Sequence, residues 1–188
     1  ITLRRISVRL MSFMMLLYLS MAINISPVQA EETEWIALTE TDLEPISLGP
    51  HENKIRSALR AKNWSYAARL LKAKTPPLQF LKAWFYVQAE QWENAIKSLV
   101  GLENHSLLDD EVNALLCQAY LKLDQPNLSN EAGARVSRVD QALWFETLRL
   151  RGQALRALKE WDKAIEVYRQ LSQSPQEFEQ GISALGLA

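Results

Sequence analysis

A tryptophan followed by small or apolar residues three, four and seven places later recurs three times along the chain. The copies begin at Trp64, Trp92 and Trp161. Steps of three, four and seven place side chains on one face of an α-helix. Each copy is therefore expected to be a helix that packs its tryptophan and its alanine in the core against a neighbouring helix. A regular recurrence of this kind is typical of helical-repeat proteins.

A second helical pattern precedes each tryptophan and sets the period. Ala83 and Gly152 each lie twelve places before the alanine of a copy, and Cys117 takes the same place between them, because residues 117–123 match residues 152–158. These small residues are 34 and 35 places apart, and Gly186 lies another 34 places on. The spacing predicts that residues at the end of the chain begin a further unit.

The spacing and the pattern resemble the tetratricopeptide repeat: a small residue where two helices touch, an aromatic residue at the turn, an alanine early in the second helix and a large apolar residue four later. The resemblance covers residues 51–188. It implies an all-α fold, an α-solenoid of antiparallel helix pairs wound as a right-handed superhelix, with about four units and the start of a fifth.

Two units depart from the pattern of the family. In the third, the turn over 124–130 is expected to be longer by about three residues, which makes Ala132 the small residue of the second helix. In the first, the equivalent of the small residue is Ile55, only 28 places before Ala83.

Start and stop signals give the expected helix bounds. The predicted pairs are 50–62 with 64–74, 76–90 with 92–103, 109–124 with 129–138, and 141–159 with 161–173. Thr75 before Pro76, and Asp140, are expected to cap helix starts. A hydrophobic content of 48% with six glycines and no Asn-Gly or Asp-Gly hairpin turn also favours helices over sheets.

Residues 1–30 belong to a different physical class. Three arginines precede an uncharged run over 10–23, and Val28-Gln-Ala30 offers small residues at the spacing that a signal peptidase accepts. The apolar run is shorter than the ~20 residues that a bilayer requires, which favours a cleaved signal peptide over the alternative, a transmembrane anchor. Cleavage predicts an exported protein, periplasmic or in the cell envelope if bacterial, with no stable membrane span.

The charge balance bears on the partner. Residues 31–50 are acidic, lack a helical period and are expected to form an extended lead segment. The chain has 21 basic and 22 acidic residues, and loss of the three arginines of the first 30 residues leaves 18 against 22, a net charge of −4. This charge argues against nucleic-acid binding, which needs a basic surface that displaces counterions from phosphate.

The sequence carries no motif typical of an enzyme. It has no glycine-rich phosphate loop, no His-Glu-x-x-His and no Gly-x-Ser-x-Gly, and His51 and His105 are interpreted as solvated or capping residues. The carboxylates at 109–111 fit an acidic helix start better than a metal site. Cys117 is interpreted as a small buried contact residue and not as a reactive thiol. We expect no catalytic residue, cofactor or metal.

The resemblance also implies where a ligand binds. In tetratricopeptide proteins one stripe of each first helix lines the inner groove, and positions three before, one after and four after the small residue share a stripe because each residue turns ~100°. The residues at these positions are Phe80, Trp84 and Val87, then Ala114, Gln118 and Leu121, then Arg149, Gln153 and Arg156. Such a stripe suits an extended peptide with a large apolar side chain and a carboxylate. The alternative is that the two arginines only solvate the helix and that Trp84 packs against the adjacent unit.

The expected function is that of an exported scaffold which binds a protein or peptide through a concave groove, because stacked helix pairs expose a long recognition surface. The alternative is a non-catalytic helical arm of a larger exported cell-envelope enzyme, similar to the superhelical arms of some lytic transglycosylases. A catalytic domain downstream favours the second hypothesis, and further repeats favour the first.

Overall fold

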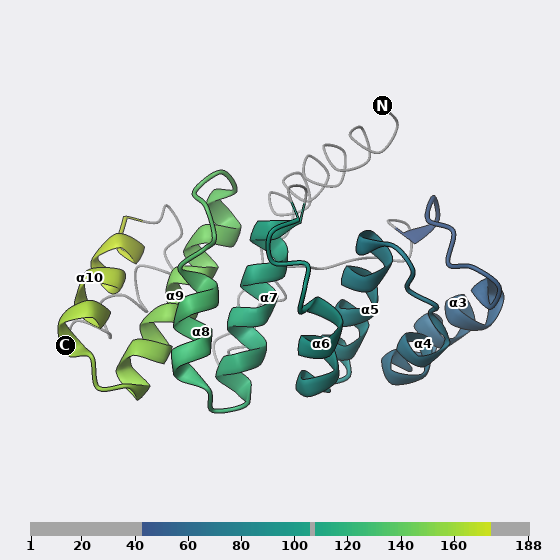
Figure 1. Ribbon diagram of the computed structural model, residues 1–188, viewed down its shortest axis with the longest axis horizontal. Coiled ribbons are helices and arrows are strands. Elements are labelled where there is room, and N and C mark those ends of the chain that lie inside the picture. Colours follow the sequence, from purple (N-terminus) through teal and green to yellow (C-terminus); the bar gives the residue numbers. More distant parts are fainter. Residues whose placement is uncertain (1–42, 106–107, 174–188) are drawn as a thin grey trace, which may run out of the picture. The chain divides into compact units, whose positions relative to one another are not determined.

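The computed structural model describes residues 43–105 and 108–173 (Figure 1). The chain divides into two compact units, one that ends at Ser47 and one that begins at Leu48, and they are described separately. All the helices described below belong to the second unit. The predicted signal peptide, the lead segment up to residue 42 and the predicted fifth unit lie outside the described residues.

The second unit is all-α over its described residues. Its helices are α3 (Glu52–Arg60), α4 (Trp64–Leu70), α5 (Pro76–Gln88), α6 (Trp92–Leu99), α7 (Asp109–Lys122), α8 (Pro126–Gly133), α9 (Gln141–Ala157) and α10 (Trp161–Leu171). Consecutive helices pack as four antiparallel pairs, α3 with α4, α5 with α6, α7 with α8 and α9 with α10 (Figure 1). The predicted all-α class and the predicted antiparallel pairing are confirmed. No helix in the described ranges is both long and apolar enough to cross a membrane.

The two helices of every pair are joined by the same turn. One residue of each turn has a left-handed backbone: Lys62, Glu90, Asp124 and Lys159, with φ of 51°, 54°, 56° and 59°. In the fourth pair the N–H of Lys159 donates to the carbonyl of Arg156 at 3.0 Å, and the N–H of Glu160 donates to the carbonyl of Leu155 at 2.9 Å. Equivalent bonds recur in the other three pairs. This pattern is the Schellman motif, which satisfies the last carbonyls of a helix.

The turn fixes the register of the contact residues of the first helices, which are small in three pairs and an isoleucine in the first pair. Each of them lies seven places before a left-handed residue, and each is buried: Ile55, Ala83, Cys117 and Gly152. The predicted correspondence between the units is therefore confirmed, including the shorter first unit.

The third pair corrects two predictions. A helix was expected over 129–138, whereas α8 runs over Pro126–Gly133. The turn is no longer than the others, and a proline takes the place of the tryptophan, since the first helical position needs no N–H donor. Ser129, and not Ala132, lies twelve places after Cys117 and is fully buried. Its hydroxyl donates to the carbonyl of Cys117 at 2.8 Å, which satisfies a polar group inside the helix contact.

The predicted caps are confirmed only in part. Asp140 caps α9, because its Oδ1 accepts the N–H of Leu143 at 3.0 Å. Thr75 occupies the N-cap of α5 and Pro76 the first turn, but the threonine side chain makes no capping hydrogen bond. The position of that cap was predicted correctly and its contact was not.

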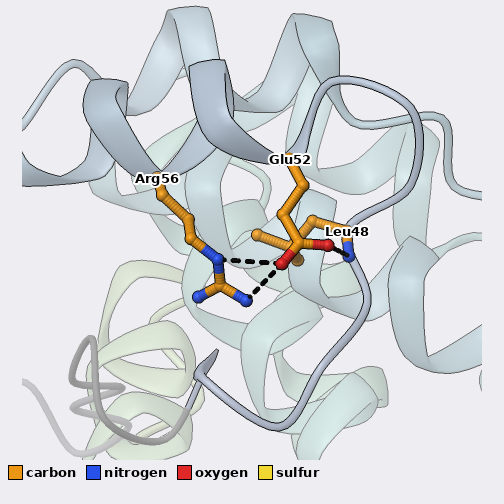
Figure 2. A network of polar contacts seen from close by, with 3 residues as sticks. All are labelled: Leu48, Glu52 and Arg56. Atoms are coloured by element: carbon orange, nitrogen blue, oxygen red, sulfur yellow. Dashed lines mark hydrogen bonds and ion pairs between the residues drawn. The ribbon is translucent and has the colours of Figure 1, made fainter.

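Helix α3 begins later than predicted and is held at its start by a carboxylate (Figure 2). Glu52 accepts the N–H of Leu48 at 3.1 Å and the Nε–H of Arg56 at 3.0 Å. The hydrogen bond from Arg56 is the largest cause that lowers the pKa of Glu52. One side chain thus ties the chain before the helix to the first two turns of α3.

The pairs follow one another in a fixed pattern of contacts. The first helices of successive pairs touch, α5 with α7 and α7 with α9. Each second helix touches the first helix of the next pair, α4 with α5, α6 with α7 and α8 with α9. The first helices of the last three pairs therefore form one layer.

Candidate functional site

Three of the residues predicted to line a groove are buried. Trp84, Val87 and Ala114 are 2%, 8% and 0% exposed, so these side chains offer almost no surface to a ligand. The Trp84 ring meets the ring of Trp64 edge-on, with the centroids 5.4 Å apart. Trp64 belongs to the preceding pair. The alternative interpretation, that Trp84 packs against the adjacent unit, is therefore confirmed, and the apolar floor is reduced to the half-buried Phe80.

Six of the predicted residues are at least partly exposed on the layer of first helices. They are Phe80 on α5, Gln118 and Leu121 on α7, and Arg149, Gln153 and Arg156 on α9. Gln118 and Gln153 hold the same position in their helices, one after the small contact residue. Because α7 packs against α9, these equivalent positions lie on neighbouring helices of one layer.

The two arginines of the stripe differ in their surroundings. The Nε of Arg149 donates to Oε2 of Glu146 at 2.9 Å, and a second guanidinium nitrogen contacts Oε1 of the same carboxylate. Glu146 is only 6% exposed. Arg156 is exposed in the last turn of α9, where the helix dipole favours a cation. Arg149 is therefore committed to a buried carboxylate, whereas Arg156 is open to a ligand.

Sequence reasoning missed Glu146. The signal was present, since an acid three places before an arginine is a common helical ion pair. Loss of Arg149 would leave Glu146 buried without its partner, which costs stability. An alanine substitution of Arg149 is therefore no clean test of ligand binding.

The acidic start of α7 makes structural contacts. Asp110 accepts the N–H of Ser137 at 2.7 Å and also binds the serine hydroxyl. Burial raises the pKa of the half-buried Glu111, and the nearby carboxylates of Asp110 and Asp140 raise it further. In the described ranges no group of three or more His, Cys, Asp or Glu side chains is placed to hold a metal ion. Through its two contacts with Ser137, Asp110 fastens the loop between α8 and α9 to the start of α7.

The thiol of Cys117 lies in the contact between α7 and α8. Its Sγ is 3.4 Å from Oγ of Ser129, and the side chain is fully buried. Burial raises the pKa of Cys117 to about 11. A thiol that stays protonated at neutral pH is a poor nucleophile and a poor metal ligand. The interpretation of Cys117 as a buried contact residue is confirmed.

The tryptophans at the turns depend on the next pair for their cover. Trp64 meets Trp84 of α5, and the ring centroid of Trp92 lies 6.0 Å from Nζ of Lys122 on α7. Trp161, in the last described pair, is 57% exposed. The expectation that Trp161 is a core anchor was wrong, because the turn places the ring at the edge of its own pair and only a neighbouring helix can cover it.

A comparison with known proteins adds no relative. No model of a known protein family matches the sequence, and no curated protein and no solved structure matches it either. The resemblance to the tetratricopeptide repeat therefore rests on the residues of this chain, and function is argued from its own geometry.

His105 was expected to be a solvated or capping residue, but the structure gives it a different place. Its backbone N–H donates to the carbonyl of Leu102 at 2.9 Å, and its backbone carbonyl accepts the N–H of Leu108 at 2.8 Å. The ring Nδ1 is buried, with no hydrogen-bond partner among the described residues. His105 therefore shapes the connection between α6 and α7.

Proposed function

We propose that the chain is an exported helical-repeat scaffold that binds an extended peptide along the layer of first helices α5, α7 and α9. The observation that carries the proposal is the recurrence of one left-handed turn in all four pairs, which holds equivalent positions of successive first helices in the same register. Pairs that touch only their neighbours are typical of a solenoid. A right-handed superhelix of the tetratricopeptide kind would present this layer as the inner surface.

The exposed residues of the stripe define the chemistry of the ligand. Gln118 and Gln153 supply amides for the backbone of an extended peptide, Leu121 supplies an apolar contact, and Arg156 supplies a cation for a carboxylate. We infer that one acidic group of the ligand, a side chain or the C-terminus, lies near the end of α9.

The exported location rests on the sequence of residues 1–30. The amino-terminal residue of protein recovered from its native host tests it: Glu31 is expected, and recovery of intact Arg4 in a membrane fraction contradicts cleavage. A helical arm of a larger exported enzyme would share this architecture, and a downstream catalytic domain in the reading frame would identify it.

Affinity for selected peptides tests the binding surface. Peptides are chosen from a random display library against the full chain, and their binding is followed by fluorescence anisotropy. Arg156→Ala is expected to weaken binding about tenfold, the loss typical of a charged hydrogen bond, with the melting temperature unchanged. Arg169→Ala is the matched control, because Arg169 is an exposed arginine on the second helix α10 that pairs with Glu166. Equal affinity in the Arg156 variant, or an equal loss in the control, contradicts the proposal.

A further inference from the structure

The basic residues are unevenly distributed along the chain. Residues 51–100, which hold the helices α3 to α6, contain nine lysines and arginines against three glutamates, a formal net charge of +6. Residues 101–173 contain nine basic and eleven acidic residues, a formal net charge of −2. The nearly neutral total of the chain therefore conceals a basic segment, and a segment of this charge attracts anions.

A hollow of about 220 Å³ lies in this basic segment. The residues that line it belong to the connection between α4 and α5, to α5, and to the end of α6: Ala73, Gln79, Lys82, Lys97, Ser98 and Val100. A single water needs only ~10–15 Å³, whereas pockets for drug-sized ligands have ~300–1,000 Å³. The hollow therefore suits a small group of several heavy atoms.

The chemistry of the lining favours an anion. None of the six lining residues is acidic, and four of them have polar side chains. Gln79 and Lys82 are three places apart and therefore share one face of α5, and Lys97 comes from α6. The two ammonium groups and the amide nitrogen are hydrogen-bond donors. Donors from two different helices thus meet at one hollow.

The two lysines of the hollow have no counter-charge in the structure. Neither Lys82 nor Lys97 forms an ion pair or a side-chain hydrogen bond with another described residue. The dipole of α6 favours a cation in its last turn, which accounts for Lys97. It does not account for Lys82, which is half-buried in the middle of α5. A half-buried ammonium group without a counter-charge points to an anion that binds from solution.

Two further lysines lie next to the hollow. Lys72 and Lys74 flank the lining residue Ala73 in the chain, and both are exposed. Neither forms an ion pair with a described residue. Several positive charges at one place favour a dianion over a monoanion, because each adds a favourable Coulomb interaction.

We propose that this hollow is a binding site for a phosphate group. A phosphate group carries a charge of about −1.5 to −2 at neutral pH and has several strong acceptor oxygens, and lysine binds phosphate as a point charge. The free ion and a phosphomonoester share this chemistry. The site is independent of the proposed peptide surface, because Lys82 is turned ~200° around α5 from Phe80, two places earlier.

A nuclear magnetic resonance titration of the full chain with inorganic phosphate tests the site. The side-chain amide of Gln79 and the backbone amides of Ala73 and Ser98 are expected to shift and to reach saturation. Acetate at the same ionic strength should cause no saturable shift, because it offers one charge and two oxygens. Shifts that do not saturate, or that are equal with acetate, would indicate screening by salt and overturn the proposal.

Charge-removing substitutions test the two lysines. Lys82→Gln and Lys97→Gln are each expected to raise the Kd for phosphate about tenfold, the loss typical of a charged hydrogen bond. Lys97 is exposed, so its substitution tests the site even if that of Lys82 disturbs the fold.

The double variant Lys54→Gln with Lys163→Gln is the matched control for the double variant Lys82→Gln with Lys97→Gln. It removes the same charge from exposed positions outside the hollow, on α3 and α10, and should bind phosphate as the unsubstituted chain does. Unchanged affinity after loss of Lys82 and Lys97, or an equal loss in the control, overturns the proposal.

A second titration distinguishes the two sources of the group. Glycerol 3-phosphate presents its phosphate on an ester arm, whereas inorganic phosphate has none. Tighter binding of glycerol 3-phosphate would assign the hollow to a phosphomonoester, and tighter binding of inorganic phosphate would assign it to the free ion. If neither probe produces saturable shifts at Gln79, the hollow is not a phosphate site.

Discussion

The contact between the two helices is filled differently in the α7–α8 pair and in the α9–α10 pair. The larger side chain comes from the first helix in α7–α8 and from the second helix in α9–α10. In α7–α8 the first helix carries Cys117 and the second carries Gly133, where an added Cβ would lie 2.9 Å from the cysteine Sγ. In α9–α10 the first helix carries Gly152 and the second carries Tyr168, and a Cβ added to the glycine would lie 2.6 Å from the tyrosine ring. Gly133 and Tyr168 are both the eighth residue of their helices. In these two pairs the facing positions therefore share one volume, and the larger residue on one side goes with the smaller one on the other.

The second pair holds an intermediate combination at these positions. Ala83 and Leu99 occupy them, and both are fully buried. In these three pairs the size of the residue in the first helix thus depends on the residue that faces it from the second helix, which explains why the chain accepts alanine, cysteine or glycine there.

Overfilling the shared volume should have the largest effect. Gly152→Leu is expected to lower the free energy of unfolding by about 3 kcal/mol, because the buried Tyr168 ring would have to leave its place. Urea denaturation followed by circular dichroism measures the change. Gln153→Leu, on the exposed side of the same helix, is the control and should stay within about 0.5 kcal/mol of the unsubstituted protein. Similar losses in both variants would contradict a shared volume.

Alkaline pH should lower the free energy of unfolding through the buried thiol of Cys117 in α7–α8, which has no equivalent in α9–α10. Burial raises the pKa of Cys117 to about 11 from an ordinary value of 9.0. The folded protein keeps a proton that the unfolded chain releases, so stability falls as pH rises through this window, by about 2–3 kcal/mol above it. Urea denaturation below pH 9 and near pH 11 should show a larger loss in the native protein than in Cys117→Ala. An equal loss would place the thiol in solvent.

A double-mutant cycle sharpens the same comparison. Gly152→Ala with Tyr168→Leu copies the residues of the second pair into the fourth. Each single substitution is expected to destabilise, by a clash or by a cavity, and the pair should recover at least about 1 kcal/mol of the summed losses. Strict additivity would show that the two positions do not share their space.

Most of the helices were predictable because strong sequence signals mark the residues at which they begin. The predicted and observed starts coincide for α4, α5, α6, α7, α9 and α10. The predicted ends of the first helices ran too far, because the left-handed residue of the turn that follows each of them is a lysine, glutamate or aspartate and never the glycine that marks such a position. In the third pair, Pro126 and Ser129 replace the tryptophan and the alanine that carried the pattern, so the sequence misplaced α8.

The candidate site was less predictable, because exposure depends on contacts between units. Helix α5 is apolar on most of its faces, so periodicity does not tell which side its neighbour covers. The burial of Trp84 follows from its contact with Trp64, twenty residues earlier. Trp161 has the same local pattern as Trp64 and a different exposure, since nothing in its own helix decides what lies beside it.

The smallest effect is expected at the turn before α10. Trp161→Ala should change the free energy of unfolding by less than about 1 kcal/mol, because the ring is already exposed to solvent. Thermal melting followed by circular dichroism measures it. A loss as large as that typical of buried aromatic residues, ~3–5 kcal/mol, would show that the ring supports the pair.

Peptide binding by the layer of first helices is tested most directly by a nuclear magnetic resonance titration with a selected peptide. The side-chain amides of Gln118 and Gln153 and the Nε–H of Arg156 are expected to shift as peptide is added. The side-chain amide of Gln170, on the second helix α10, should stay in place. Shifts confined to Gln170 and other residues of α4, α6, α8 and α10 would contradict binding by the first helices.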